Sequence, residues 1–243
     1  MTDFSDTNWA DSEFAKEYLD NAEAYVPFRQ EMLKVLALYY RNFILEKESR
    51  CVLDLGCGDG ILSRIVLGLD EKASITLVDG SQEMLDQAAE RLGSQANLSY
   101  LESSFQDLVK NDPIEGFFDL VMSSLAIHHL SGEDKVSLYE YIYGRLNPGG
   151  YFINIDVVLA PTDELEAWYM QVWEEWIERR KAEGKTDRDF SDIIRRYKEN
   201  TDNVPDTLSF QLKTLEKIGF AQVDCFYKHG VFVIFGGRKE IIR

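Results

Sequence analysis

The 243-residue chain is predicted to form an α/β fold, with a mostly parallel sheet covered by helices on both faces. Two observations predict this. From residue 51 onward, short apolar runs alternate with segments of helical periodicity, as in β-α-β units. The apolar runs are rich in Val, Ile, Leu and Phe, as strands buried on both faces should be. With 45% hydrophobic and 12% aromatic residues, the chain can also build one large core.

Five strands and two of the helices between them follow from this pattern. The strands are expected at residues 51–55, 74–79, 98–101, 117–124 and 151–158. A helix is expected over 81–92, because Ser81 is a suitable N-cap and the apolar residues that follow share one face. A second helix should open at residues 131–134, which form a capping-box pattern, and should include Leu146. The Asn-Pro-Gly-Gly stretch at 147–150 predicts a stop and a turn.

Three further regions complete the predicted organisation. Residues 11–45 look helical and precede the first strand, so residues 1–49 are expected to form an N-terminal helical cap. Residues 50–243 are expected to form the α/β domain, which includes a helical lid insertion at 160–205. Two β-rich runs within 221–237 surround a Lys-His-Gly turn, which predicts an antiparallel hairpin at the sheet edge.

The charge excludes several classes of partner. The formal net charge is −17 and the pI is near 4.6, which disfavours nucleic acid and anionic membrane surfaces. The three cysteines form no CxxC pair and no metal-ligand spacing, so no metal site is expected. The acidic N-terminus lacks the apolar stretch of a signal peptide, and no window is long and apolar enough to span a membrane. A cytoplasmic location is therefore expected, with a homodimer left open.

The stretch CVLDLGCGDGILSR, residues 51–64, places three glycines directly after a predicted strand. A dinucleotide fingerprint would need a glycine where Ile61 stands, and a phosphate loop would need a Lys-Ser/Thr pair that is missing. A nucleoside without phosphates needs only close backbone and an acid for its hydroxyls. Asp79 ends the next predicted strand about 20 residues further on, where a carboxylate can accept hydrogen bonds from ribose. Met84 could then cover an adenine ring.

These motifs resemble the class I S-adenosylmethionine-dependent methyltransferases. The matching pieces are VLDLGCGDG, LVDGSQEML, YLESSF, FDLVMSSLAIHHL and LNPGGYFI, across about residues 50 to 158 and again in the final hairpin. The resemblance implies a seven-stranded sheet of order 3-2-1-4-5-7-6 with strand 7 antiparallel. It implies S-adenosyl-L-methionine as cofactor and S-adenosyl-L-homocysteine as product. The expected cofactor-binding residues are Asp54, Gly56, Cys57, Gly58, Asp79, Gly80, Met84, Ser104, Phe105, Ser123 and Arg29.

Roles within that set differ. The resemblance places Gly56, Cys57 and Gly58 against the methionine part, Asp79 against the ribose, and Gly80 and Met84 beside the adenine. Ser104 stands where the family often has an acid that binds the adenine amino group, with Phe105 next to the ring. The backbone from Ser123 onward would border the sulfonium, and Arg29 or Tyr25 would cover the cofactor carboxylate.

Three residues are candidates for a general base. His128 and His129 follow the fourth predicted strand, and Asp156 ends the fifth. Histidine titrates near neutrality, which suits proton transfer. Methyl transfer from a sulfonium is an in-line displacement that positioning alone can accelerate, so a reaction without a base is the alternative.

The acceptor is expected to be a small molecule held between the N-terminal helices and the insertion. Candidate wall residues are Tyr18, Tyr25, Phe28, Arg29, Trp168, Tyr169, Trp173 and Trp176. The predicted function is methyl transfer to this acceptor. The alternatives are a cofactor-modifying enzyme similar to the carboxy-S-adenosylmethionine synthases and a non-catalytic cofactor-binding protein. Those synthases use an arginine where this chain has Thr214, which favours plain methyl transfer, although the adjacent Lys213 keeps the question open.

Overall fold

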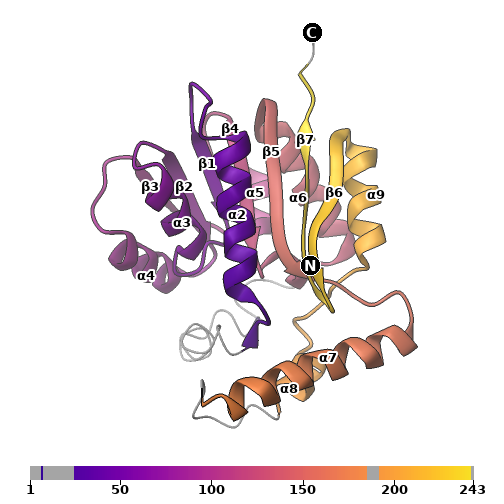
Figure 1. The fold of residues 1–243 in the computed structure, drawn as a ribbon. Coiled ribbons are helices and arrows are strands. Elements are labelled where there is room, and N and C mark those ends of the chain that lie inside the picture. Colours follow the sequence, from indigo (N-terminus) through magenta and orange to yellow (C-terminus); the bar gives the residue numbers. More distant parts are fainter. Residues whose placement is uncertain (1–6, 8–24, 185–191, 242–243) are drawn as a thin grey trace.

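A computed structural model describes residues 7, 25–184 and 192–241, and its centre is a seven-stranded sheet. The strand order is β3-β2-β1-β4-β5-β7-β6, as expected (Figure 1). β7 pairs antiparallel with both β5 and β6, whereas the other neighbours pair in parallel. The strands are β1 (Cys51–Leu55), β2 (Ser74–Asp79), β3 (Leu98–Glu102), β4 (Phe118–Ser124), β5 (Leu146–Val157), β6 (Phe220–His229) and β7 (Phe232–Lys239).

The start of β5 differs from the prediction. The strand begins at Leu146 and runs through residues 147–150, where the sequence predicts the end of a helix and a turn. Leu146 pairs with Phe118 of β4, and a register shift follows before Tyr151 pairs with Leu120. Gly150 lies against the carbonyl oxygen of Phe118, where a Cβ atom would come within 2.9 Å. The Pro-Gly-Gly stretch therefore forms an irregular strand. Pairing with β4 outweighs the local preference of these residues for a turn.

Helices cover both faces of the sheet and form two apolar layers. On one face, α2 (Arg29–Phe43), α3 (Ile61–Leu69) and α4 (Gln82–Leu92) share a core with side chains such as Val52 and Leu77. On the other face, α5 (Phe105–Asn111), α6 (Gly132–Arg145) and α9 (Leu208–Ile218) pack on side chains such as Leu53 and Val121. Neighbouring strand residues point to opposite layers, as a doubly covered sheet requires.

Side-chain caps fix where the predicted helices begin. Ser81 accepts a hydrogen bond from the backbone N–H of Met84, and Ser131 accepts one from that of Asp134. Both caps confirm the sequence-based starts of α4 and α6. They matter for the site because each helix begins just beyond the carboxyl end of a strand.

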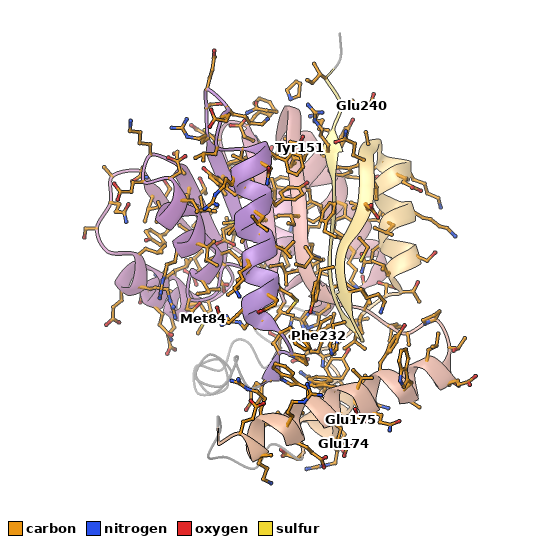
Figure 2. The ribbon with its side chains drawn as sticks, viewed as in Figure 1. Met84, Tyr151, Glu174, Glu175, Phe232 and Glu240 are labelled. Atoms are coloured by element: carbon orange, nitrogen blue, oxygen red, sulfur yellow. The ribbon has the colours of Figure 1, made fainter. Side chains whose placement is uncertain are left out.

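The predicted insertion contains α7 (Asp163–Ala182) and α8 (Ile193–Glu199), which lie across the carboxyl ends of the parallel strands (Figure 1). Met170, Trp173 and Ile177 of α7 are buried and belong to the same core layer as α2. Figure 2 places Phe232 between the sheet and α7, while Glu174 and Glu175 lie on the outer side of α7. Thr207 pairs with Leu159, so the insertion starts and ends at one place.

The N-terminal region is described at residue 7 and from residue 25 onward. Its helix α2 packs on the sheet through Met32, Leu36 and Tyr40, all buried. It therefore contributes to the main core rather than standing apart from it. Among the described residues, no helix is long and apolar enough to cross a bilayer.

Candidate active site

Two cavities lie at the carboxyl ends of the central strands. The first, which we call the glycine-loop cavity, has a volume of about 260 Å³ and is walled by the turn after β1 and the ends of β2, β3 and β4. Ten of the eleven predicted cofactor-binding residues line it. They are Asp54, Gly56, Cys57, Gly58, Asp79, Gly80, Met84, Ser104, Phe105 and Arg29. The fold therefore gathers these ten residues from four separate segments at one place.

The three glycines of the turn have different surroundings, although all have positive φ. A Cβ atom on Gly56 would come within 2.5 Å of the Cβ atom of Ala126, and one on Gly60 within 3.2 Å of that of Ala88. Gly58 has no heavy atom within 4 Å of a built Cβ atom, so its bare backbone faces the open cavity. Gly56 and Gly60 thus serve packing, and Gly58 leaves room for a ligand.

Asp79 closes β2 and is held by the backbone around it. Its Oδ2 accepts a hydrogen bond from the N–H of Gly58 at 2.8 Å, and its Oδ1 accepts one from the N–H of Ser81 at 2.9 Å. These bonds fix the position of the carboxylate, which lines the glycine-loop cavity. Burial raises the pKa of Asp79, against the lowering effect of the same N–H groups.

Asp54, at the end of β1, is fully buried. Its Oδ2 accepts a hydrogen bond from the Ser63 hydroxyl at 2.6 Å, whereas its Oδ1 has no hydrogen-bond partner among the described residues. Burial raises the pKa of Asp54 to about 7. A buried carboxylate that lines a cavity with one oxygen unpaired is suited to a cationic or hydrogen-bond-donating ligand group.

Two predicted cofactor residues have other primary contacts. Ser123 does not line the cavity: it is fully buried and its hydroxyl donates to the carbonyl oxygen of Leu55 at 2.7 Å, which ties β4 to β1. The next residue, Ser124, lines the cavity instead, because successive side chains of a strand point to opposite faces. Ser104 lines the cavity, but its hydroxyl caps α5 by accepting from the N–H of Asp107 and donating to its carboxylate.

The second cavity, which we call the insertion cavity, has a volume of about 360 Å³ and lies between the sheet and the α7–α8 segment. Leu125 and His129 line both cavities, so the two cavities adjoin at these residues. Leu125 has a φ of 52°, an unfavourable conformation for a side chain with a Cβ atom. It is held there by a hydrogen bond from its N–H to the carbonyl oxygen of Ile155. Such strain is often concentrated at functional sites.

The three predicted catalytic candidates form a connected group. Nδ1 of His128 lies 2.6 Å from Oδ1 of Asp156, and both side chains are buried. Nδ1 of His129 lies 2.9 Å from the carbonyl oxygen of Asp202, which can only accept, so this nitrogen carries the proton. Burial and the neighbouring His128 hold the pKa of His129 well below its usual range. The sequence offers three alternatives, and the fold joins two of them into a His128–Asp156 pair.

The predicted acceptor-wall residues separate into several groups. Tyr25 and Trp173 line the insertion cavity, and the indole N–H of Trp173 donates to the carbonyl oxygen of Tyr25. Arg29 lines the glycine-loop cavity, so the two residues considered for the cofactor carboxylate face different spaces. Neither Thr214 nor Lys213 lines either cavity. Tyr18 lies outside the described residues.

The remaining aromatic candidates have packing contacts. The rings of Phe28 and Trp176 pack against each other with centroids 4.4 Å apart. Trp168 is 56% exposed, and Tyr169 lies beneath the ammonium of Lys228. These four do not line the insertion cavity.

Sequence reasoning misses much of the insertion cavity. Tyr197, Asn203 and Phe232 line it, and Val204 lines the glycine-loop cavity. Tyr197 comes from α8 and Phe232 from the start of β7, more than thirty residues apart in sequence. No motif links these positions, because only the folded insertion brings them together.

Comparisons with known proteins bear on this geometry. Residues 52–150 match the family model of a methyltransferase domain. This region of the chain is similar to a methyltransferase domain, and it lies within a sheet of the expected strand order. The match spans the glycine turn, Asp79 and the two adjacent histidines, and it ends before Asp156 and the insertion. The matched region thus supplies most of the residues that line the glycine-loop cavity, whereas the insertion cavity is built largely from residues beyond it.

Individual relatives are more distant. A carboxy-S-adenosyl-L-methionine synthase of Chromohalobacter salexigens is 26% identical over 73% of this chain and 64% of its own length. A malonyl-[acyl-carrier protein] O-methyltransferase of Ilyobacter polytropus is 30% identical over 56% of this chain and 46% of its own length. The chain thus spans less than two thirds of the length of both. The solved structure of a magnesium protoporphyrin IX methyltransferase from Synechocystis PCC 6803, with bound S-adenosylhomocysteine, superimposes with a TM-score of 0.60, 15% identity and coverage of 96% of each chain, which establishes similarity of fold.

Proposed function

We propose that the chain is an S-adenosylmethionine-dependent methyltransferase acting on a small molecule, with the cofactor in the glycine-loop cavity. The observation that carries the proposal is the juxtaposition of Gly58, Asp79 and Asp54 around one open space. Gly58 would allow the amino-acid part of the cofactor to approach the backbone. Asp79 would accept hydrogen bonds from the ribose hydroxyls. Oδ1 of Asp54 would accept a hydrogen bond from the cofactor ammonium, either directly or through a water molecule.

The charge of the cavity supports this cofactor. S-adenosylmethionine carries a sulfonium, an ammonium and one carboxylate, which leaves a net positive charge. Among the described side chains that line the cavity, Asp54, Asp59, Asp79 and Asp134 are carboxylates and Arg29 is the guanidinium. An acidic cavity favours a cationic ligand over an anionic nucleotide. When bound, the sulfonium supplies an activated methyl group, and the protein's task is to hold the acceptor in line with it.

Carboxy-S-adenosylmethionine synthesis is the second candidate, because a synthase is among the relatives. Its product has an additional carboxylate and therefore no net positive charge. The glycine-loop cavity is lined by one described guanidinium, that of Arg29, and by four acids, of which Asp59 is ion-paired with Arg91. Lys213 is exposed and lines neither cavity. The charge balance therefore supports the plain sulfonium cofactor.

A small acceptor in the cytoplasm is part of the proposal. The net charge of −17 disfavours nucleic acid as the acceptor. Cys51, Cys57 and Cys225 are free thiols, as expected in a reducing compartment.

The test is to identify and titrate the ligand. Mass spectrometry of the native protein should detect S-adenosylmethionine or S-adenosylhomocysteine, and calorimetry should give saturable binding of both. Asp79→Asn should weaken this binding by at least about tenfold, since two ribose hydrogen bonds are lost or weakened. Asp86→Asn, on the exposed side of α4, is the matched control and should bind normally. A carboxylated adduct in the native protein would establish the second candidate instead.

A further inference from the structure

The His128–Asp156 pair has the geometry of an oriented proton acceptor. Oδ1 of Asp156 lies 2.6 Å from Nδ1 of His128 and also accepts from the N–H of Val157, while Oδ2 accepts from the amide of Asn154. Three donors therefore stabilise the Asp156 carboxylate, which in turn fixes the proton of neutral His128 on Nδ1. Nε2 then carries the lone pair. His128 lines the insertion cavity and does not line the glycine-loop cavity.

Aromatic rings line the same cavity as His128 and make much of its wall apolar. The ring of Trp173 meets Phe232 edge-on with centroids 5.0 Å apart, and meets Tyr197 with centroids 5.3 Å apart. The hydrogen bond from Trp173 to the carbonyl oxygen of Tyr25 holds the indole in place. A cavity of about 360 Å³ exceeds twice the roughly 150 Å³ cavity that holds benzene, so it can take a compound of about two rings.

We propose that the insertion cavity binds a planar, apolar compound with an acidic hydroxyl, such as a phenol or an enol, and that His128 accepts the hydroxyl proton while Asp156 orients it. This rests on the proposed function, because the hydroxyl oxygen must meet the cofactor methyl group where the two cavities adjoin, at Leu125 and His129. The ring system would pack on Trp173 and Phe232. Its hydroxyl would face His128, whose ring centroid lies 3.9 Å from that of His129 at the junction of the cavities.

The step is balanced with these groups alone. The acceptor O–H bond breaks, and its proton passes to Nε2 of His128. The acceptor oxygen uses an electron pair to form the new O–CH₃ bond, while the electrons of the methyl–sulfur bond remain on sulfur in the thioether product. The imidazolium, stabilised by Asp156, later releases its proton to water.

His129 has a different role from its neighbour. Its Nδ1 is bonded to a backbone carbonyl oxygen rather than to a carboxylate, so an imidazolium at this position gains less stabilisation. Burial, which lowers its pKa, has the same consequence. His129 is therefore a neutral residue at the place where the two cavities adjoin.

A chromogenic phenol tests the proposal without turnover. 4-Nitrophenol is titrated into the full-length protein saturated with S-adenosylhomocysteine, at a pH below the probe's own pKa, and the visible phenolate band is recorded. The wild type should bind the probe and increase the phenolate fraction. His128→Asn and Asp156→Asn should each lower that fraction at least about fivefold, and His229→Asn, whose residue lines neither cavity, is the matched histidine control.

Turnover provides the second readout. With labelled S-adenosylmethionine, phenols should be methylated in preference to amines and carboxylates of similar size. His128→Asn should lower kcat by about 100-fold or more with a smaller change in KM, since general base catalysis contributes on this scale. S-adenosylhomocysteine binding, measured by calorimetry, should be unchanged in His128→Asn and in Asp156→Asn.

The outcomes are distinguishable. If the wild type did not bind S-adenosylhomocysteine, the proposed function itself would be wrong. If cofactor binding is intact, any of three results would overturn the acceptor assignment alone. The probe could bind as the neutral phenol, amines could be the preferred acceptors, or His129→Asn rather than His128→Asn could remove the phenolate signal.

Discussion

At the scale of single residues, the site contains a buried carboxylate whose hydrogen bonds do not fully replace those it would make to water. Asp54 is fully buried, and one of its carboxylate oxygens has no hydrogen-bond partner among the described residues. The ionised form of this residue is therefore costly in the ligand-free protein. A bound cation would lower that cost, so the same carboxylate that weakens the empty fold would strengthen ligand binding.

The pH dependence of stability follows from Asp54. Because its pKa is raised from 3.8 to about 7, the folded state holds a proton that the unfolded state releases between these values. The ligand-free protein should lose stability as pH rises across this window, by about 4 kcal/mol at most from this one group. Asp54→Asn should remove that slope and raise the melting temperature at pH 8 more than at pH 4. Denaturant titrations at several pH values measure it, and an unchanged slope in the variant would contradict the assignment.

Gly58 gives a second prediction at this scale. An added methyl group would enter the glycine-loop cavity, and the φ of 51° adds about 1–2 kcal/mol of strain. Gly58→Ala should therefore weaken S-adenosylhomocysteine binding by tenfold or more in calorimetry. Gly68→Ala, inside α3 where a Cβ atom meets nothing within 4 Å, should leave binding unchanged and stabilise the protein by up to about 1 kcal/mol. Equal binding by the two variants would mean that no ligand approaches Gly58.

At the scale of elements, the segment that follows α8 joins the two cavities. Val204 lines the glycine-loop cavity and Asn203 lines the insertion cavity. The N–H of Val204 donates to the carbonyl oxygen of His128. Lys135 of α6 is fully buried and donates to the carbonyl oxygen of Val204 and to the carboxylate of Asp206, the latter at 2.7 Å. Lys135 thus holds the segment whose backbone is hydrogen-bonded to His128.

Lys135→Met should expose the role of this contact. Removing one partner of a buried ion pair costs about 3–5 kcal/mol, and the partial exposure of Asp206 reduces the expected loss to about 2–3 kcal/mol. The variant should remain folded, raise the KM for the acceptor more than that for the cofactor, and lower the melting temperature. Lys217→Met, on the exposed side of α9, is the control. A larger effect on cofactor KM than on acceptor KM would contradict this role.

At the scale of the whole molecule, the glycine-loop cavity and the insertion cavity lie at the same edge of the sheet but are built from different parts of the chain. The glycine-loop cavity is lined mostly by residues 52–150, the region similar to a methyltransferase domain, whereas the α7–α8 insertion closes the other cavity. The insertion leaves and rejoins the sheet at paired residues, since Leu159 bridges Thr207 and the N–H of Leu159 donates to the carbonyl oxygen of Asp206. This arrangement allows the insertion to be removed without separating the strands that it connects.

A deletion tests this division. Replacing residues 161–202 with about four glycines, long enough to span the neighbouring ends, should keep the sheet and S-adenosylhomocysteine binding. It should abolish nitrophenol binding, and it should lower stability because Trp173 and Ile177 no longer cover Phe232. Circular dichroism checks folding and calorimetry checks both ligands. A folded variant that loses the cofactor but keeps the phenol would contradict the division.

Local patterns predicted most of the secondary structure and the cofactor side of the site. The strand limits at 51–55 and 74–79 agree with the structure, and the Ser81 and Ser131 caps occur as expected. The start of β5 was wrong, because the turn preference of Pro-Gly-Gly yields to pairing with β4. Ser123 was placed one residue away from the side chain that faces the cavity, since register is set by neighbouring strands.

The sequence by itself determined the α/β fold and the glycine turn followed by Asp79, because these depend on short-range periodicity and on the fixed length of a β-α-β unit. Only the tertiary structure decided that His128 pairs with Asp156 and that His129 does not. It alone formed the insertion cavity, from residues of α8, β7 and the segment before α2. Those contacts are long-range, and they depend on the packing of α7 against the sheet, which no local pattern encodes.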